Sequence, residues 1–107
     1  MYGEKVSALL KQQPCFTSQI SLAELSSWCE RNQIDSEKYL SFVKSQSKII
    51  PLSDYLLELA GKIHFYKRKT VKDFGLIDAI ILATSKQYNL PIITGDHHFD
   101  GENVVLL

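Results

Sequence analysis

The sequence has few of the features that would assign a protein to a specialised class. Its two cysteines, Cys15 and Cys29, lie too far apart for a CxxC redox motif or a zinc knuckle, and we expect them to be buried and reduced. Twelve basic and twelve acidic side chains give a formal net charge of zero, so attraction to a nucleic acid would have to come from a local patch. No apolar run is long enough to cross a bilayer. These absences predict one cytoplasmic domain over residues 1–107.

The apolar pattern predicts alternating helices and strands. The strands are apolar without polar alternation, which is typical of buried parallel strands, so the predicted fold class is α/β with three layers and a mainly parallel sheet. The direction of the last pairing stays open, because only residues 96–102 join the last two strands. The predicted helices lie at 3–12, from Ser21, after Asp35, at 53–63 and at 75–89, and the predicted strands at 15–20, 48–52, 91–94 and 103–107.

Three acids fall at the carboxyl ends of predicted strands or in the helical turns that follow them, where an open parallel sheet binds its ligands. They are Glu24, Asp78 and Asp96. Carboxylates that converge on one site repel each other unless a cation is present, and Mg²⁺ or Mn²⁺ suits a site made of oxygen ligands. Such a metal activates water and stabilises charge on a phosphodiester. The three acids therefore predict metal-dependent phosphodiester hydrolysis, in which they hold the metal and orient the water.

Each acid also has a structural interpretation. Glu24 fits a capping box with Ser21, and Asp96 fits an ordinary turn after Gly95. Asp78 fits a helix N-terminus, where a carboxylate complements the dipole. Its apolar neighbours nevertheless predict that this charge has a partner, because an unpaired buried carboxylate is costly.

The residues after Asp96 extend this ionisable group. Adjacent His97 and His98 lack the spacing of zinc ligands, so we expect them at the rim of the site, where one of them contacts phosphate or substrate. Asp100 is a candidate outer-shell acid.

The stretch "HFYKRKTVKD" carries four cations beside two aromatic residues and leads into the helix of Asp78. This composition predicts that the stretch holds the phosphates of single-stranded RNA, with the aromatic rings as stacking surfaces. The alternative is a solvated helix end, where cations favour the dipole. The candidate RNA-binding residues are Lys67, Arg68, Lys69 and Lys72.

Two segments, "TSQISLAELSSW" and "GLIDAIILATSKQYNLPIITGDHHF", resemble the PIN-domain family, especially its small VapC-type toxin ribonucleases. The resemblance covers about residues 4–107. It maps Glu24, Asp78 and Asp96 onto the second, third and fourth acids of the family, and Thr94 onto a strand-end hydroxyl. It implies a three-layer fold with a parallel sheet, bound Mg²⁺ or Mn²⁺, and cleavage of single-stranded RNA by water. It also implies frequent homodimers and, for the toxins, an antitoxin that occupies the site.

The sequence departs from the family pattern at its start. The family begins with an apolar strand, central in the sheet, that ends in the first acid, whereas "MYGEKVSALL" resembles the helix after that strand. We therefore expect an N-terminally incomplete domain that lacks the first, central strand, so that the remaining strands leave a gap or close up against each other. The explanations are a trimmed gene product, a strand supplied by another chain, or a non-catalytic relative. The last gives the alternative function, an interaction domain that binds RNA or a protein partner.

Overall fold

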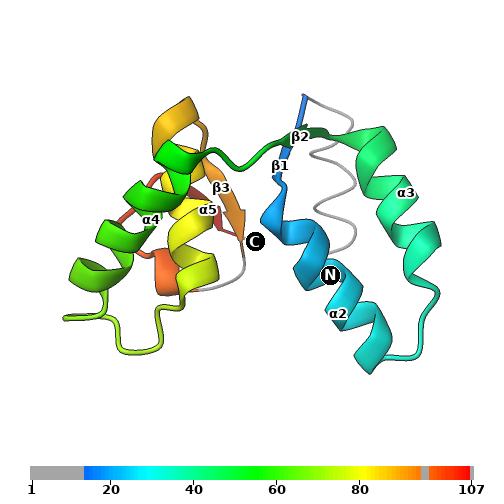
Figure 1. The fold of residues 1–107 in the computed structure, drawn as a ribbon, viewed down its shortest axis with the longest axis horizontal. Coiled ribbons are helices and arrows are strands. Elements are labelled where there is room, and N and C mark those ends of the chain that lie inside the picture. Colours follow the sequence, from blue (N-terminus) through cyan, green and yellow to red (C-terminus); the bar gives the residue numbers. More distant parts are fainter. Residues whose placement is uncertain (1–13, 95–96, 107) are drawn as a thin grey trace. The chain divides into compact units, whose positions relative to one another are not determined.

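The structure is a computed structural model that describes residues 14–94 and 97–106 (Figure 1). It divides into two compact units, Met1–Pro51 and Leu52–Leu107. The α/β class predicted from the sequence is confirmed, since helices alternate with short parallel strands. The expectation that residues 1–107 form a single domain stays a prediction, and the helix expected at 3–12 lies outside the described residues.

The first unit contains two short parallel strands connected through two helices. Thr17 lies opposite Ile49 in the strand pair, and the amide of Gln19 continues the pairing by donating to the carbonyl of Ile50 at 2.9 Å. Because Gln19 still belongs to this ladder, the first helix starts directly after it. The elements of this unit are β1 (Phe16–Ser18), α2 (Ile20–Arg31), α3 (Ser36–Gln46) and β2 (Lys48–Ile50).

The apolar interior of the first unit is small. Cys29 of α2 is fully buried, as expected, and Ile50 of β2 is 6% exposed. Cys15, also expected to be buried, is only half-buried. The apolar stripe of residues 36–46 predicts that Tyr39 faces inward, but its side chain is 42% exposed and meets the ring of Trp28 edge to face, with centroids 6.3 Å apart. No residue of α3 is buried in the described part of the chain. This helix therefore contributes less to the core than its apolar stripe predicts.

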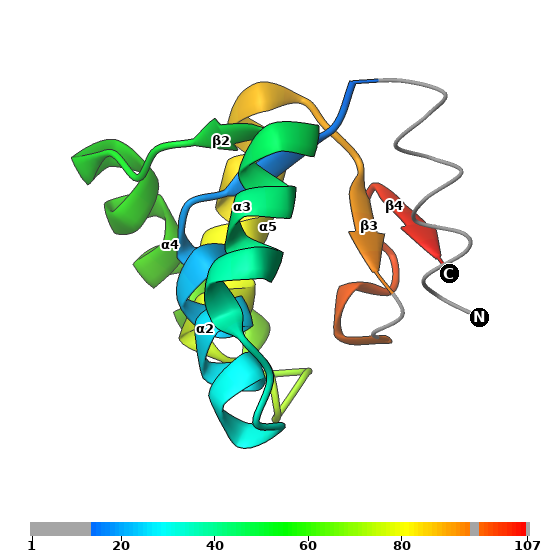
Figure 2. The same ribbon diagram turned by 90° about the vertical axis from the view of Figure 1, so that its right-hand side faces the viewer.

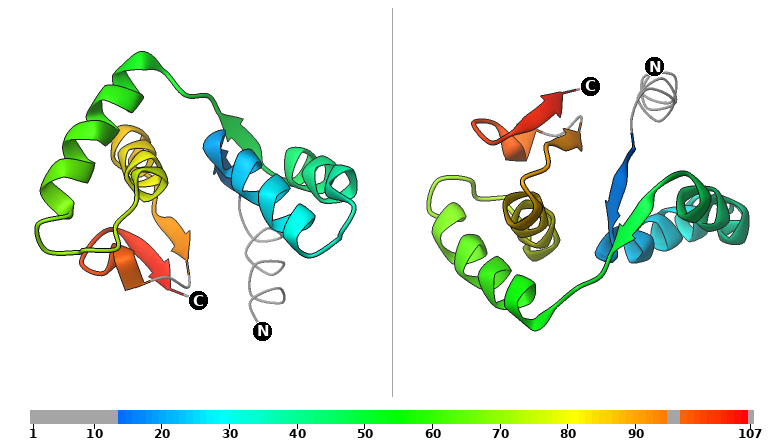
Figure 3. Two further views of the ribbon diagram at one scale, coloured as in Figure 1. Left: turned by 60° about the horizontal axis from the view of Figure 1, so that its bottom comes forward. Right: turned by 90° about the horizontal axis from the view of Figure 1, so that it is seen from above.

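The second unit is a pair of helices packed along each other beside a second parallel strand pair (Figure 3). Ile92 lies opposite Val104, so the direction that the sequence left open is parallel. A short 3-10 helix lies within the connection, and Figure 2 shows the two strands side by side. The elements are α4 (Asp54–Lys67), α5 (Leu76–Tyr88), β3 (Ile92–Thr94), η1 (His97–Phe99) and β4 (Val104–Leu106).

The core of the second unit fixes the start of α5. Phe74, directly before the helix, is fully buried and meets Phe99 of η1 edge to face, with ring centroids 6.0 Å apart. Within α5 the buried residues begin at Ala79, whereas Leu76 and Ile77 are 53% and 38% exposed. The sequence predicts a helix buried from Leu76 onwards. The exposed first turn corrects this prediction and leaves its polar groups accessible.

The strands do not form one sheet within the described residues. They form two separate parallel pairs, β1–β2 and β3–β4. The parallel direction is confirmed. The two pairs lie in different units, so the expected consequence of a missing central strand stays a prediction. None of the helices in residues 14–94 and 97–106 combines the length and the apolar character of a membrane span.

Candidate functional site

Asp78 lies in the first turn of α5, three residues after its N-cap, Gly75. Its Oδ2 atom accepts a hydrogen bond from the Gly75 N–H at 3.0 Å. This is the carboxylate half of a capping box, because glycine has no side chain to complete the other half. The negative charge also faces the positive end of the helix dipole. The structural interpretation of Asp78 is thus realised, and it fixes the direction in which the carboxylate points.

His98 provides the partner that the sequence predicts for Asp78. Its Nδ1 atom lies 3.3 Å from Asp78 Oδ2, and the two side chains are 33% and 22% exposed. The contact does not have the geometry of a hydrogen bond. It is electrostatic, and the carboxylate of Asp78 attracts the imidazole when the imidazole is protonated. The neighbouring Phe99 is 4% exposed and packs on Phe74, which holds η1 beside the start of α5. The sequence predicts His98 only at the rim of the site, because the packing of Phe99 on Phe74 joins segments that no local motif connects.

The carboxylate oxygens of Asp78 are ligands of the type that a hard cation prefers, but the described residues bring too few such ligands together to bind one. Both contacts of Asp78 use Oδ2, and carboxylate oxygen is the ligand that Mg²⁺ and Mn²⁺ favour. Within residues 14–94 and 97–106, no three His, Cys, Asp or Glu side chains come close enough to share a metal ion. Asp96 and the His97 side chain lie outside the described residues. A complete ligand set would therefore need Asp96 or a further acid.

Glu24 lies on α2, in the first unit, and is exposed. The capping-box interpretation with Ser21 as N-cap is wrong, since α2 begins at Ile20 and its N-cap is Gln19. Gln19 makes no side-chain cap hydrogen bond, and its backbone amide donates to the carbonyl of Ile50. Glu24 and Asp78 lie in different compact units, and their convergence stays a prediction.

The basic stretch does not form one continuous surface. Lys67 ends α4 and turns toward Glu102, with its Nζ atom 3.5 Å from the carboxylate. Arg68 is the C-cap of α4, and Lys72 lies exposed in the loop that follows. The helix-end interpretation is therefore realised for Lys67, which lies where the dipole favours a cation.

Lys69 has a different environment. Its Nζ atom lies 4.9 Å and 4.8 Å from the ring centroids of Phe65 and Tyr66, and these two exposed rings meet edge to face at 5.1 Å. An ammonium group over an aromatic face is attracted by the ring quadrupole. Lys69 and the two rings thus form an exposed cation–aromatic cluster, which is the chemistry that the RNA hypothesis requires.

Two accessory candidates are described. Thr94 is the last residue of β3, at the strand end where the sequence analysis expects its hydroxyl. Asp100 is exposed in the turn after η1. Their roles stay predictions.

A comparison with known families supports this assignment of the fold. The family described as PIN domain matches residues 2–101, which includes most of both units. A search of the curated proteins finds no match. The PIN-domain match indicates a nuclease superfamily, whose members generally use divalent metals. Because the match spans most of the sequence, the chain belongs to the PIN-domain family.

Proposed function

We propose that this chain is a metal-dependent endoribonuclease that hydrolyses phosphodiester bonds of single-stranded RNA. The observation that carries the proposal is the pairing of Asp78 with His98 at the exposed start of α5. Asp78, which the resemblance maps onto an acid of the PIN-domain pattern, is oriented by the Gly75 amide. His98 lies beside it, and a protonated imidazole can bind phosphate.

Asp78 and Asp96, together with Glu24, would hold Mg²⁺ or Mn²⁺. When bound, the metal supplies activated water and stabilises the charge of the phosphodiester. The Gly75 amide keeps Asp78 Oδ2 oriented. Protonated His98 would neutralise one carboxylate charge and approach a phosphate oxygen. Lys67, Arg68, Lys69 and Lys72 would position the strand.

The more specific proposal is a VapC-type toxin that is cytoplasmic, forms a homodimer and is inhibited by an antitoxin. The exposed Leu76 and Ile77, beside Asp78, support it. An apolar surface at the edge of a polar site is one that a second protein would cover.

Cleavage of a single-stranded RNA in the presence of Mn²⁺ tests the proposal. Replacing Asp78 with Asn should lower the rate about 100-fold or more, because loss of a metal ligand should cost at least as much as loss of its outer-shell partners. Asp73→Asn is the matched control, since Asp73 carries the same charge in the exposed loop before α5. Equal cleavage by Asp78→Asn and the control would refute the assignment of Asp78.

A second candidate is a non-catalytic interaction domain. It is favoured by the structural contacts of Asp78, which already caps α5 and pairs with His98. Thermal unfolding with increasing Mn²⁺ separates the two candidates, because an ion that binds only the folded state must raise the unfolding temperature. A rise that Asp78→Asn abolishes supports the nuclease, whereas an unchanged unfolding temperature supports the interaction domain.

A further inference from the structure

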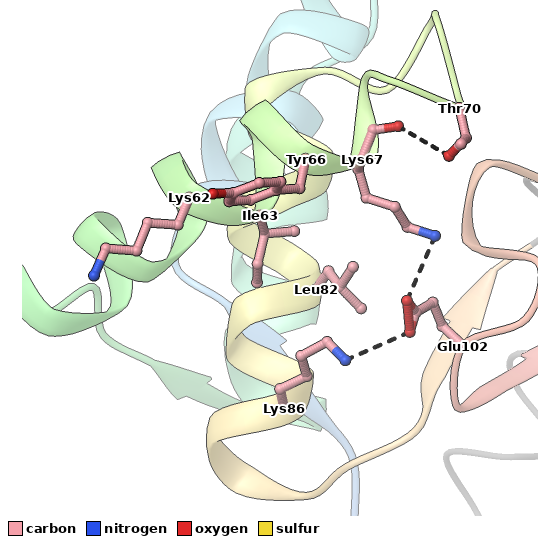
Figure 4. A pocket seen from close by; sticks show the side chains of 8 residues that line it. All are labelled: Lys62, Ile63, Tyr66, Lys67, Thr70, Leu82, Lys86 and Glu102. Carbon is pink, nitrogen blue, oxygen red and sulfur yellow. Dashed lines mark hydrogen bonds and ion pairs between the residues drawn. The ribbon is translucent and has the colours of Figure 1, made fainter.

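The second unit contains a pocket that shares Tyr66, Lys67 and Thr70 with the basic stretch but is otherwise lined by residues outside the candidate site (Figure 4). It lies between α4, α5 and the turn before β4 and has a volume of about 330 Å³. Its polar lining includes three lysines and one glutamate, which leaves two positive charges in excess. These residues are Lys62, Lys67, Lys86 and Glu102.

Glu102 is an internal counter-ion of this pocket. One carboxylate oxygen lies 3.5 Å from Lys67 Nζ and the other 3.6 Å from Lys86 Nζ. Figure 4 marks both ion pairs with dashed lines. Charged hydrogen bonds are normally about 2.7–2.9 Å long, so both contacts are loose. The Lys86 side chain is 52% exposed. An incoming anion could therefore replace the carboxylate without opening a tight ion pair.

The rest of the lining is that of a site for an amphipathic anion. Leu82 and Ile63 provide aliphatic surface, and Tyr66 presents an aromatic ring beside the lysines (Figure 4). Sites for single-stranded nucleic acids combine cations for the backbone with aromatic rings for the bases. A simple anion would use the lysines but not the ring.

The pocket also lies near the candidate site in the chain. Glu102 and His98, which pairs with Asp78, are separated by a short segment, and Glu102 N–H donates to the Phe99 carbonyl at 3.0 Å. Even fully extended, such a segment would keep the Cα atoms of His98 and Glu102 within about 14 Å of each other. A strand that reaches Asp78 could thus continue into the pocket.

We propose that this pocket binds one phosphate of a single-stranded RNA together with its neighbouring base. The phosphate replaces Glu102 as the counter-ion of Lys67 and Lys86, and the base lies against Tyr66. The inference rests on the proposed function for the identity of the ligand, but binding here requires neither cleavage nor a metal.

The test is the affinity of the whole chain for a fluorescent single-stranded RNA, measured with a chelator over a range of salt concentrations. The double variant Lys67→Gln/Lys86→Gln should bind about tenfold more weakly. The slope of log affinity against log salt should become shallower by about 0.7 for each lysine that contacts a phosphate. Lys44→Gln, an exposed lysine in the last turn of α3, is the matched control.

Glu102→Gln gives an expectation of the opposite sign. Removing the internal counter-ion should raise RNA affinity about threefold to fivefold, because the phosphate no longer competes with a carboxylate. Circular dichroism of each variant checks its fold. Unchanged or weaker binding by Glu102→Gln would overturn the inference, as would a double variant that binds like Lys44→Gln. If polyglutamate at the same concentration of negative charge displaced the RNA, the pocket would be a general anion-binding surface, and this result would also overturn the inference.

The two proposals can fail separately. If RNA binding depended on Lys67 and Lys86 but no Mn²⁺-dependent cleavage were found, the binding pocket would be supported and the nuclease function refuted. If cleavage depended on Asp78 but RNA affinity did not change when the two lysines were replaced, the nuclease function would be supported and the binding pocket refuted.

Discussion

The rings of Phe74 and Phe99 meet edge to face, with centroids 6.0 Å apart and planes inclined by 75°. Both side chains are buried, and each lies next to a segment of the candidate site in the sequence. Phe74 precedes the N-cap of α5, and Phe99 follows His98. This contact therefore holds His98 at Asp78, although neither residue of the aromatic pair belongs to the site.

Replacing Phe99 with Ala should destabilise the chain by about 3–5 kcal/mol, because the change removes a buried ring and leaves a cavity. Urea unfolding followed by circular dichroism measures the loss. Phe65→Ala is the matched control, since the Phe65 ring is 62% exposed and its removal should cost about 0.5 kcal/mol or less. Similar losses in the two variants would show that Phe99 is not a core residue.

Asp78 should respond differently to Asn and to Ala. Asn keeps an acceptor for the Gly75 N–H, so Asp78→Asn should lose less than about 1 kcal/mol through the helix dipole alone. Asp78→Ala should lose about 0.5–2 kcal/mol, as other cap removals do. Unfolding midpoints of both variants, compared with their cleavage rates, separate the structural role from the chemical one. If cleavage followed stability across the two variants, the catalytic role of Asp78 would be lost.

His98→Gln tests the charge contact. The pair is partly exposed, so its loss should change the free energy of unfolding by less than about 1 kcal/mol. Cleavage should nevertheless fall, since Gln cannot become positively charged and attract a phosphate oxygen. His64→Gln is the control, because His64 lies in the last turn of α4. A fall in stability with unchanged cleavage would assign His98 a structural role only.

Asn89 ends α5 in the left-handed conformation, with φ 52° and ψ 50°. Glycine adopts this conformation without strain, whereas a β-branched side chain does not. Asn89→Gly should therefore leave stability unchanged or raise it slightly, and Asn89→Val should lower it by about 1–2 kcal/mol. Thermal unfolding of the two variants checks this order, and the reverse order would mean that the Asn89 side chain itself stabilises the helix end.

Local patterns predict the helices well where capping residues in the sequence mark the ends of the helix. The helix expected at 75–89 is found at Leu76–Tyr88, because Gly75 and Asn89 mark its two ends. The helix expected at 53–63 begins as predicted after the N-cap Ser53, whose hydroxyl accepts from Leu56 N–H. The helix continues to Lys67, beyond its predicted end. Phe65 and Tyr66 in its last turn are exposed and do not extend the buried stripe from which the end was predicted.

Contacts between distant segments could not be predicted in the same way. No spacing rule brings His98 to Asp78, because their distance depends on the packing of Phe74 against Phe99. The division of the basic stretch, with Lys67 on Glu102 and Lys69 on the aromatic rings, likewise depends on where α4 ends. Local patterns thus locate the candidate segments but not the contacts that those segments make.

The place of Glu102 has a consequence for how the pocket can be observed. The next residue, Asn103, accepts through its carbonyl a hydrogen bond of 2.9 Å from the amide of Ile92, the first residue of β3. When RNA displaces Glu102 from Lys67 and Lys86, the position of the neighbouring Asn103 carbonyl is held less firmly, and its hydrogen bond from the Ile92 amide changes. The deuterium uptake of a single backbone amide, that of Ile92, would therefore report occupancy of the pocket without any label on the RNA.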